Sequence, residues 1–199
     1  HFIGFEKFSN FKKETANHEI ILTSPEIKSP GAWNELVVSW NADAPSGTYL
    51  KIEARGIYPD HATKFYTMGL WSEDASKFPR ERVEKQKDAD GKVNTDTLIL
   101  NQLCDKAQIR VTLGSADKNL AAKLKFIGLS FLNDKVEVAP LPPNKKAWGK
   151  VIKTPERSQL SYPEEQGWCS ATSLAMVMMR WSEVLHRPEL HLDVRNCAA

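Results

Sequence analysis

The chain has 199 residues, of which 41% are hydrophobic and 26% are charged, so it can bury a core and is not globally disordered. Its 27 basic and 25 acidic residues are interspersed and leave a net charge of +2, which gives no indication of a nucleic-acid partner. No apolar run approaches the ~18–20 residues that a membrane-spanning helix needs, so we expect no membrane span.

Alternating apolar and polar residues predict β-strands through the first two-thirds of the chain. In residues 48–58, the apolar Leu50, Ile52 and Ala54 alternate with charged residues, which is typical of a half-buried antiparallel strand. Residues 35–40 alternate in the same way. Because the segment between these two runs is rich in Asn, Asp, Pro and Gly, the two strands are predicted to form a hairpin.

Further strands are predicted from the same pattern, with turn-forming residues between them. They cover residues 19–24, 64–71, 95–100, 107–113 and 122–132. In the last run the alternation slips between Phe126 and Gly128, so a bulge or a change of face is expected there. About seven short strands with no convincing helix among them predict a mainly β fold, an antiparallel β-sandwich or jelly roll.

The chain changes character after this strand-rich region. Residues 136–150 carry three prolines within four positions and are predicted to form an extended linker. From Ser170 onward, apolar residues recur at helical spacing, which predicts a helix with one apolar stripe that Pro188 brings to an end. We therefore expect a β-sandwich domain over 1–135, the linker, and the start of a different domain over 151–199.

The three cysteines are too few for a disulfide scaffold, and their odd number leaves at least one thiol free. Cys104 lies among strand-forming residues and is expected to be a small buried hydrophobe. Cys169 lies at the first turn of the predicted helix, where free backbone N–H groups and the helix dipole favour a nucleophilic thiolate. A capping or core cysteine would occupy the same place, and a disulfide between Cys169 and Cys197 stays open.

The C-terminal part of the chain carries a family resemblance. Residues 155–190, with the core Gly-Trp-Cys-Ser-Ala-Thr-Ser, resemble the start of papain-like cysteine peptidases of the bacteriocin-processing family, numbered thirty-nine, and especially its secreted bacterial relatives. The chain also resembles the β-sandwich that often precedes this peptidase domain, in residues 33–56, 65–74, 87–100 and 108–113. The resemblance implies an incomplete papain-like α+β domain over 151–199 and an extracellular or cell-envelope location.

In that family a cysteine is the nucleophile, a histidine from a later strand is its base, and an Asp or Asn orients the histidine. The resemblance assigns the nucleophile to Cys169 and a part in the oxyanion hole to Gln166, beside the backbone N–H of Cys169. After the cysteine only His186 and His191 remain, near the end of the predicted helix. A helix of about 16 residues places His186 roughly 25 Å from the thiol, so neither histidine is expected to be the base.

The resemblance therefore implies the N-terminal portion of a cysteine peptidase or amidase that acts on peptide or protein substrates through a thiol acyl-enzyme. The chain by itself is expected to be inactive, because His18 and His61 lie in the predicted sandwich and are not expected to supply the missing base. No cofactor is expected. The alternative is a non-catalytic β-sandwich module that binds a glycan or a cell-envelope partner.

Two weaker patterns accompany these. A set of oxygen-bearing side chains resembles a calcium loop, and it comprises Asp88, Asp90, Asn94 and Asp96. Its spacing is not that of an EF-hand, so a solvated turn is the preferred interpretation and no metal site is expected. A set of aromatic residues could line a sugar-binding surface or simply belong to the core, and it comprises Trp33, Tyr58, Tyr66 and Trp71.

Overall fold

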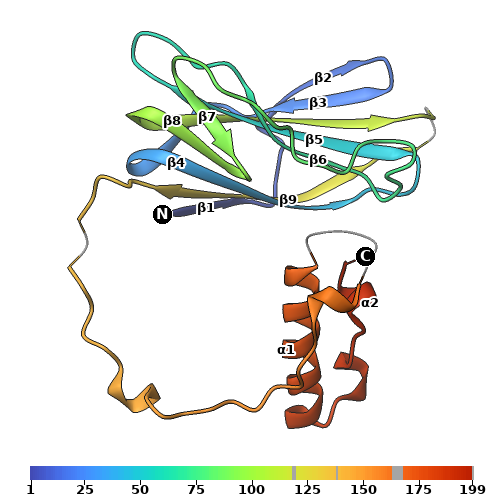
Figure 1. The fold of residues 1–199 in the computed structure, drawn as a ribbon. Coiled ribbons are helices and arrows are strands. Elements are labelled where there is room, and N and C mark those ends of the chain that lie inside the picture. The colour runs from blue at the N-terminus through green and yellow to red at the C-terminus, as the bar shows by residue number, and fades with distance from the viewer. Residues whose placement is uncertain (118–119, 138, 163–167, 199) are drawn as a thin grey trace. The chain divides into compact units, whose positions relative to one another are not determined.

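The computed structural model describes residues 1–117, 120–137, 139–162 and 168–198, which form two compact units, His1–Ala139 and Pro140–Ala199 (Figure 1). The first unit contains strands β1 (Phe2–Phe5), β2 (Lys12–Ala16), β3 (Glu19–Thr23), β4 (Ile27–Asp43), β5 (Thr48–Ile57), β6 (Tyr66–Trp71), β7 (Gly91–Asn94), β8 (Thr97–Ser115) and β9 (Lys123–Leu132). The second contains helices η1 (Lys145–Ala147), η2 (Gln159–Ser161), α1 (Cys169–Leu185), η3 (Pro188–Leu190) and α2 (Val194–Ala198).

The nine strands form one curled antiparallel sheet, which confirms the prediction of a mainly β, antiparallel fold (Figure 1). Six strands follow the order β1-β9-β4-β8-β3-β2, while β5 pairs with β6 and β8, and β7 pairs with β8. The 17-residue β4 and the 19-residue β8 each pair with several partners along their length. These two long strands therefore hold the sheet together.

Two predictions about the strands are wrong. β4 and β5 do not form a hairpin; β4 pairs with β8 and β9, and β5 pairs with β6 and β8. The runs 95–100 and 107–113 are not separate strands but parts of β8, because Cys104 and Lys106 between them continue the pairing with β4. Backbone hydrogen bonds to neighbouring strands thus keep the residues between the two runs extended, although apolar and polar side chains no longer alternate there.

The bulge expected near Phe126 is confirmed. Asn41 of β4 pairs with Phe126 and Ala42 pairs with Leu124, which leaves Lys125 as the extra residue in β9. A second irregularity lies in β6, where the register against β5 shifts around Met68. Bulges of this kind increase local twist and turn the following side chains in a new direction.

The core lies inside the curled sheet. The alternating residues predicted to face it from β5, namely Leu50, Ile52 and Ala54, are all 0% exposed. The largest fully buried side chains of the unit come from β4, β5, β6, β8 and β9, and they are Trp33, Leu36, Leu50, Ile52, Tyr66, Leu98, Leu100, Ile109, Val111, Ile127 and Leu129. Each buried aliphatic or aromatic side chain contributes about 1.5–3 kcal/mol of transfer free energy, so this core is the main source of the unit's stability.

In the second unit, α1 covers 17 residues and begins at Cys169, as the apolar spacing predicts. Its buried face consists mainly of small residues, Ala171 and Ala175 among them, which let α2 approach closely. The larger apolar residues of the predicted stripe stay about half exposed, and they are Leu174, Val177, Trp181 and Leu185. The described residues of 136–150 are all exposed and form no regular element apart from the short helix η1, and their function as a linker stays a prediction.

Among the described residues, helices long and apolar enough to cross a bilayer are absent.

Candidate functional site

The predicted nucleophile lies at the start of α1. Cys169 is the first residue of the helix and is exposed to solvent. The residue before it, Trp168, has helical backbone angles (φ −70°, ψ −1°), and no side chain described in the structure caps the helix there. Among the described residues, the backbone N–H groups of the first turn therefore have no capping side chain near the thiol.

A small apolar cluster holds this helix start in place. Val194 of α2 is 1% exposed and packs against Ala171 and Ala175, with Cys197 at the edge of the cluster. Before the helix, the rings of Tyr162 and Trp168 stack with their centroids 5.0 Å apart and an interplanar angle of 25°.

The guanidinium group of Arg195 completes this arrangement. It lies 5.8 Å from the ring centroid of Tyr162 and 5.9 Å from that of Trp168, within the range of cation–π attraction. The ring stack and the cation come from segments on both sides of α1. Packing from α2 and from the residues before the helix thus orders the backbone that carries Cys169.

All three cysteines are free thiols, so the disulfide between Cys169 and Cys197 is not formed. Cys104 is 4% exposed, which confirms the prediction of a buried hydrophobe. Burial raises the pKa of the Cys104 thiol, although the carbonyl oxygens of Lys106 and Ile57 lie within hydrogen-bonding distance of its sulfur. Cys169 is therefore the thiol that solvent and reagents reach most readily.

The catalytic partners implied by the resemblance are not assembled around Cys169. Gln166 lies outside the described residues. His186 follows the last helical residue in a left-handed conformation (φ 53°), and a 17-residue helix separates it from the thiol by about 25 Å. His191 follows η3, and among the described residues neither histidine hydrogen-bonds to the thiol. In the part of the chain that the structure describes, the exposed thiol of Cys169 therefore has no histidine beside it.

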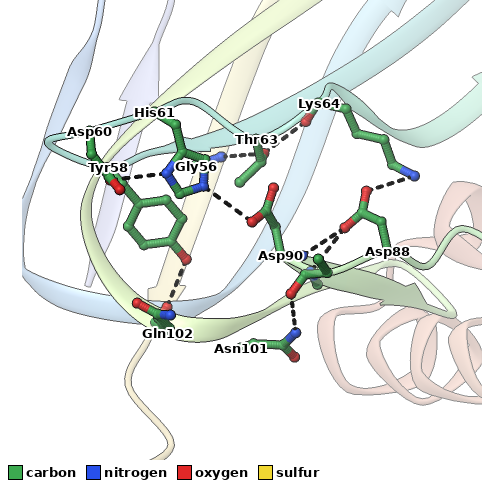
Figure 2. Close-up of polar contacts among 12 residues, drawn as sticks. Gly56, Tyr58, Asp60, His61, Thr63, Lys64, Asp88, Asp90, Asn101 and Gln102 are labelled. Atoms are coloured by element: carbon green, nitrogen blue, oxygen red, sulfur yellow. Dashed lines mark hydrogen bonds and ion pairs between the residues drawn. The ribbon is translucent and has the colours of Figure 1, made fainter.

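A second group of polar residues lies in the first unit, between the loop after β5 and the loop before β7 (Figure 2). The carboxylate of Asp88 accepts hydrogen bonds from the Tyr66 hydroxyl and from the backbone N–H groups of Asp90 (3.0 Å) and Gly91 (3.1 Å), and Lys64 Nζ lies 2.9 Å from it. Burial raises the pKa of Asp88, but these hydrogen bonds outweigh it and hold the pKa at about 2. Burial and the same contact raise the pKa of Tyr66.

His61 is the centre of the other half of this network. Its Nδ1 lies 3.0 Å from Asp60 and its Nε2 lies 3.1 Å from Asp90 (Figure 2). The imidazole also stacks on Tyr58, with ring centroids 4.9 Å apart, and the Tyr58 hydroxyl donates to the carbonyl oxygen of Gln102 (3.0 Å). These contacts tie both loops to β8, so the network has a structural role that the sequence pattern did not indicate.

The same contacts show what the four candidate calcium ligands do in the structure. Asp88 and Asp90 lie in the turn before β7 and bind protein donors, so the turn is confirmed but it is not simply solvated. Asn94 and Asp96 lie at the tight connection from β7 to β8, where Thr95 has φ 58°. Groups of His, Cys, Asp and Glu that could hold a metal ion are not found among the residues described.

The aromatic set divides between core and surface. Trp33 is 1% exposed and Tyr66 is 0% exposed, so neither can line a sugar-binding surface. Trp71 is half-buried and lines a cavity of about 240 Å³ together with Trp40, Asn41 and Ala42. The sequence pattern does not distinguish Trp40 from a core residue, because Trp40 alternates with Ser39 and Asn41 as a core residue would.

Residues 9–131 match the family model described as Peptidase C39 N-terminal domain. The chain belongs to this family. The Peptidase C39 N-terminal domain match covers β2 to β8 and all of β9 except its last residue, and it does not reach Cys169. The comparison with curated proteins and the comparison with solved structures each found no match.

The His61 contacts predict a pH dependence of stability. Hydrogen bonds to Asp60 and Asp90 raise the pKa of His61 above its ordinary value of about 6.5. Because the folded-state pKa is the higher one, the stabilisation is complete below about pH 6.5 and is lost as the pH rises through the folded-state pKa. We expect the urea midpoint of the wild type to fall between about pH 6 and about pH 8, and that of His61→Gln to fall less.

The matched control is His18→Asn, since His18 lies in the exposed turn between β2 and β3 with φ 65°, a conformation that asparagine tolerates. This variant should keep the pH dependence of the wild type. A wild type and a His61→Gln protein with parallel pH profiles would contradict the assignment.

Proposed function

We propose that this chain is the N-terminal portion of a cysteine peptidase or amidase-type hydrolase in which Cys169 is the nucleophile. The observation that carries the proposal is the position of an exposed thiol at the first residue of a packed helix, in a chain that belongs to the Peptidase C39 N-terminal domain family. A thiolate at such a position benefits from the free N–H groups and the positive end of the helix dipole. Membership of the family supports a peptidase relationship. An extracellular or cell-envelope location is part of the proposal.

The proposed chemistry is acyl transfer from a peptide or protein substrate. The thiolate forms a bond to the carbonyl carbon while the carbonyl oxygen takes the negative charge, close to the N–H of Cys169. The C–N bond then breaks, the amine leaves with a proton, and water cleaves the thioester to release the acid. Acyl transfer also needs a base that takes the proton from the thiol and passes it to the leaving amine, and no described histidine lies beside Cys169 to do so. We therefore expect no hydrolysis from this chain alone.

The exposed side of α1 supports a larger peptidase-like domain. Leu174 is 47% exposed, Val177 and Trp181 are each 49% exposed, and Val184 is 43% exposed. With Ile152 and Thr154 of the preceding segment, the last three of these line a cavity of about 460 Å³. A soluble surface seldom keeps so much contiguous apolar area uncovered, so we expect further residues of a papain-like α+β domain to pack there.

The experiment that tests the nucleophile is alkylation of the 199-residue chain with iodoacetamide near neutral pH, followed by peptide mass spectrometry. We expect Cys169 to react at least about tenfold faster than Cys104 in the folded chain, because Cys104 is buried and its pKa is raised. Cys169 should also react faster in the folded chain than in urea, because only the folded helix provides its dipole and N–H groups.

The comparison with urea separates activation from mere exposure. If Cys169 reacted at the same rate in the folded and unfolded chain, it would be an ordinary surface thiol and the proposed nucleophile would be rejected. Cys169→Ser provides the control for assignment, since it should remove the fast phase and leave the slow labelling of Cys104 unchanged.

A second candidate function is favoured by one observation, the solvent-exposed cavity between Trp40 and Trp71. In this alternative the curled sheet is a β-sandwich module that binds a glycan or another cell-envelope partner and does not catalyse. The two functions are compatible, because a module of this kind can deliver a hydrolase to its substrate.

A further inference from the structure

The cavity lies where the core-facing rows of two strands reach the edge of the first unit. On β4, the row that begins with the buried Leu36 and Val38 ends at Trp40, which is only half-buried. On β6, Trp71 pairs with Leu50 of β5, and Leu50 is 0% exposed while Trp71 is half-buried. Both indoles therefore face inward yet keep part of their surface open to solvent.

The backbone beside each tryptophan departs from regular pairing. The bulge at Lys125 lies opposite Asn41 and Ala42, directly after Trp40. In β6, the register shift at Met68 lies shortly before Leu70 and Trp71, the last two residues of the strand. Bulges next to a site redirect side chains away from the regular pleat. The opening between the two indoles is thus a feature of the backbone and not a packing defect of single side chains.

The Trp40 ring has little freedom to close this opening. A Cβ atom built on Gly69 would lie 2.7 Å from Trp40 Cη2, so the indole packs directly on the backbone of β6. Only a residue without a side chain permits this close approach. The ring is therefore held in place before any ligand arrives, which reduces the entropic cost of binding.

The chemistry of the lining is mixed. Two indole surfaces and the Ala42 methyl group are apolar, whereas the exposed Asn41 contributes polar atoms to the lining. A matching ligand needs a flat apolar face and hydroxyl groups at its rim. A pyranose ring with equatorial hydroxyl groups has this character, because its axial C–H bonds form the apolar faces and its hydroxyl groups point outward. Tryptophan combines apolar area with a polar N–H group and suits such a ligand.

We infer that the cavity between Trp40 and Trp71 binds one pyranose ring of a glycan whose hydroxyl groups are equatorial, with Asn41 hydrogen-bonded to its rim. This inference rests on the second candidate function, the binding module, and gives it a site and a ligand class. It does not depend on the reactivity of Cys169.

The first test is a titration of the 199-residue chain with cellobiose, followed by NMR of the indole N–H signals. β-1,4-Galactobiose is the matched ligand control, because each of its two rings differs from the corresponding ring of cellobiose only in an axial oxygen at C4. We expect cellobiose to shift the signals of Trp40 and Trp71 and galactobiose to bind more weakly. Trp71→Ala and Asn41→Ala should each weaken binding of cellobiose by about tenfold, equivalent to about 1.4 kcal/mol.

Two controls keep this result interpretable. Trp148→Ala removes a tryptophan that is 64% exposed in the other unit and should leave the affinity unchanged. Asn41 is exposed and does not contribute to the core, so Asn41→Ala decides the matter if Trp71→Ala fails to fold. Cellobiose binding that both Asn41→Ala and Trp71→Ala leave unchanged would overturn the site.

A parallel measurement separates the site from the binding role. The wild type and both variants are mixed with purified, insoluble peptidoglycan, and the bound fraction is measured after sedimentation. If the wild type binds and the variants bind equally well, the inferred site is wrong while the binding role stands. If the wild type binds neither peptidoglycan nor cellobiose, the glycan-binding role fails together with the site. Binding of a proline-rich peptide at Trp40 and Trp71 in place of sugars would also overturn the inference.

Discussion

Arg110→Met is expected to lower the free energy of unfolding of the His1–Ala139 unit by about 3–5 kcal/mol. Arg110 on β8 pairs directly across from Glu53 on β5, and its Nε and Nη2 donate to the two carboxylate oxygens at 2.7 and 2.9 Å. Glu53 is only 4% exposed, so loss of the arginine would leave a buried carboxylate with Lys51 Nζ, 3.1 Å away, as its remaining cation. A buried charge that loses its main partner is strongly destabilising.

The measurement is urea unfolding of the variant and the wild type, followed by tryptophan fluorescence. Lys106→Met is the matched control on the same strand, because the ion pair between Lys106 and Glu26 is exposed, with side chains 42% and 52% accessible. Exposed pairs of this kind contribute about 0–1 kcal/mol, so this variant should stay close to the wild type. Equal losses from both variants would show that burial of Glu53 does not govern the cost.

The double variant Arg110→Met, Glu53→Met sharpens the test. If the uncompensated carboxylate causes the loss, replacing it as well should restore part of the stability, since apolar replacements of buried ion pairs are often tolerated. If the added Glu53→Met substitution lowered the free energy of unfolding further and restored none of it, this explanation would be contradicted.

Gly91→Ala is expected to lower the same free energy by about 3 kcal/mol, at the upper end of the usual cost of overpacking. A Cβ atom on Gly91 would lie 2.4 Å from the carbonyl oxygen of Ile99, a backbone atom that cannot move aside without opening the pairing of β7 with β8. The Gly91 N–H also donates to Asp88, so displacement of this residue would weaken the network that holds Tyr66 and His61.

Hydrogen exchange of the β7 amides and urea unfolding would both report this effect. Gly31→Ala is the matched control, because the nearest atom to an added Cβ there is in the His1 side chain, 3.5 Å away, and that distance is ordinary contact. Gly31→Ala should change stability by less than about 0.5 kcal/mol. A Gly91→Ala protein with normal β7 protection would show that the close approach is not needed.

The period-two alternation predicted most of the strands and their buried faces correctly. In β5 the predicted core residues Leu50, Ile52 and Ala54 are buried, although Glu53 on the opposite face is buried as well. The alternation did not correctly predict which strands pair with each other. The turn-rich segment after β4 suggested a hairpin, but β8 lies between β4 and β5 in the hydrogen-bonded network. Alternation reports that one face of a strand is buried and carries no information about which strand lies alongside.

For the candidate site, too, the local structure could be predicted from the sequence and the long-range partners could not. Helical spacing placed Cys169 at a helix start, because the period of apolar residues is a local property of the chain. The histidine partner implied by the resemblance could not be placed, and the structure adds none beside the thiol among the residues it describes. The residues around Asp88 predict only a solvated turn from the sequence, because the contact of Asp88 with Tyr66 joins residues that are 22 positions apart.

The sequence by itself determined the mainly β character of the first two-thirds, the burial of Cys104 and the start of α1 at Cys169, because each follows from the polarity of neighbouring residues. Only the tertiary structure decided the pairing of β4 and β5 with β8, the network around Asp88 and His61, and the cavity between Trp40 and Trp71. These features join segments far apart in the chain, and they depend on which long-range contacts repay the entropy of closing the loops between them.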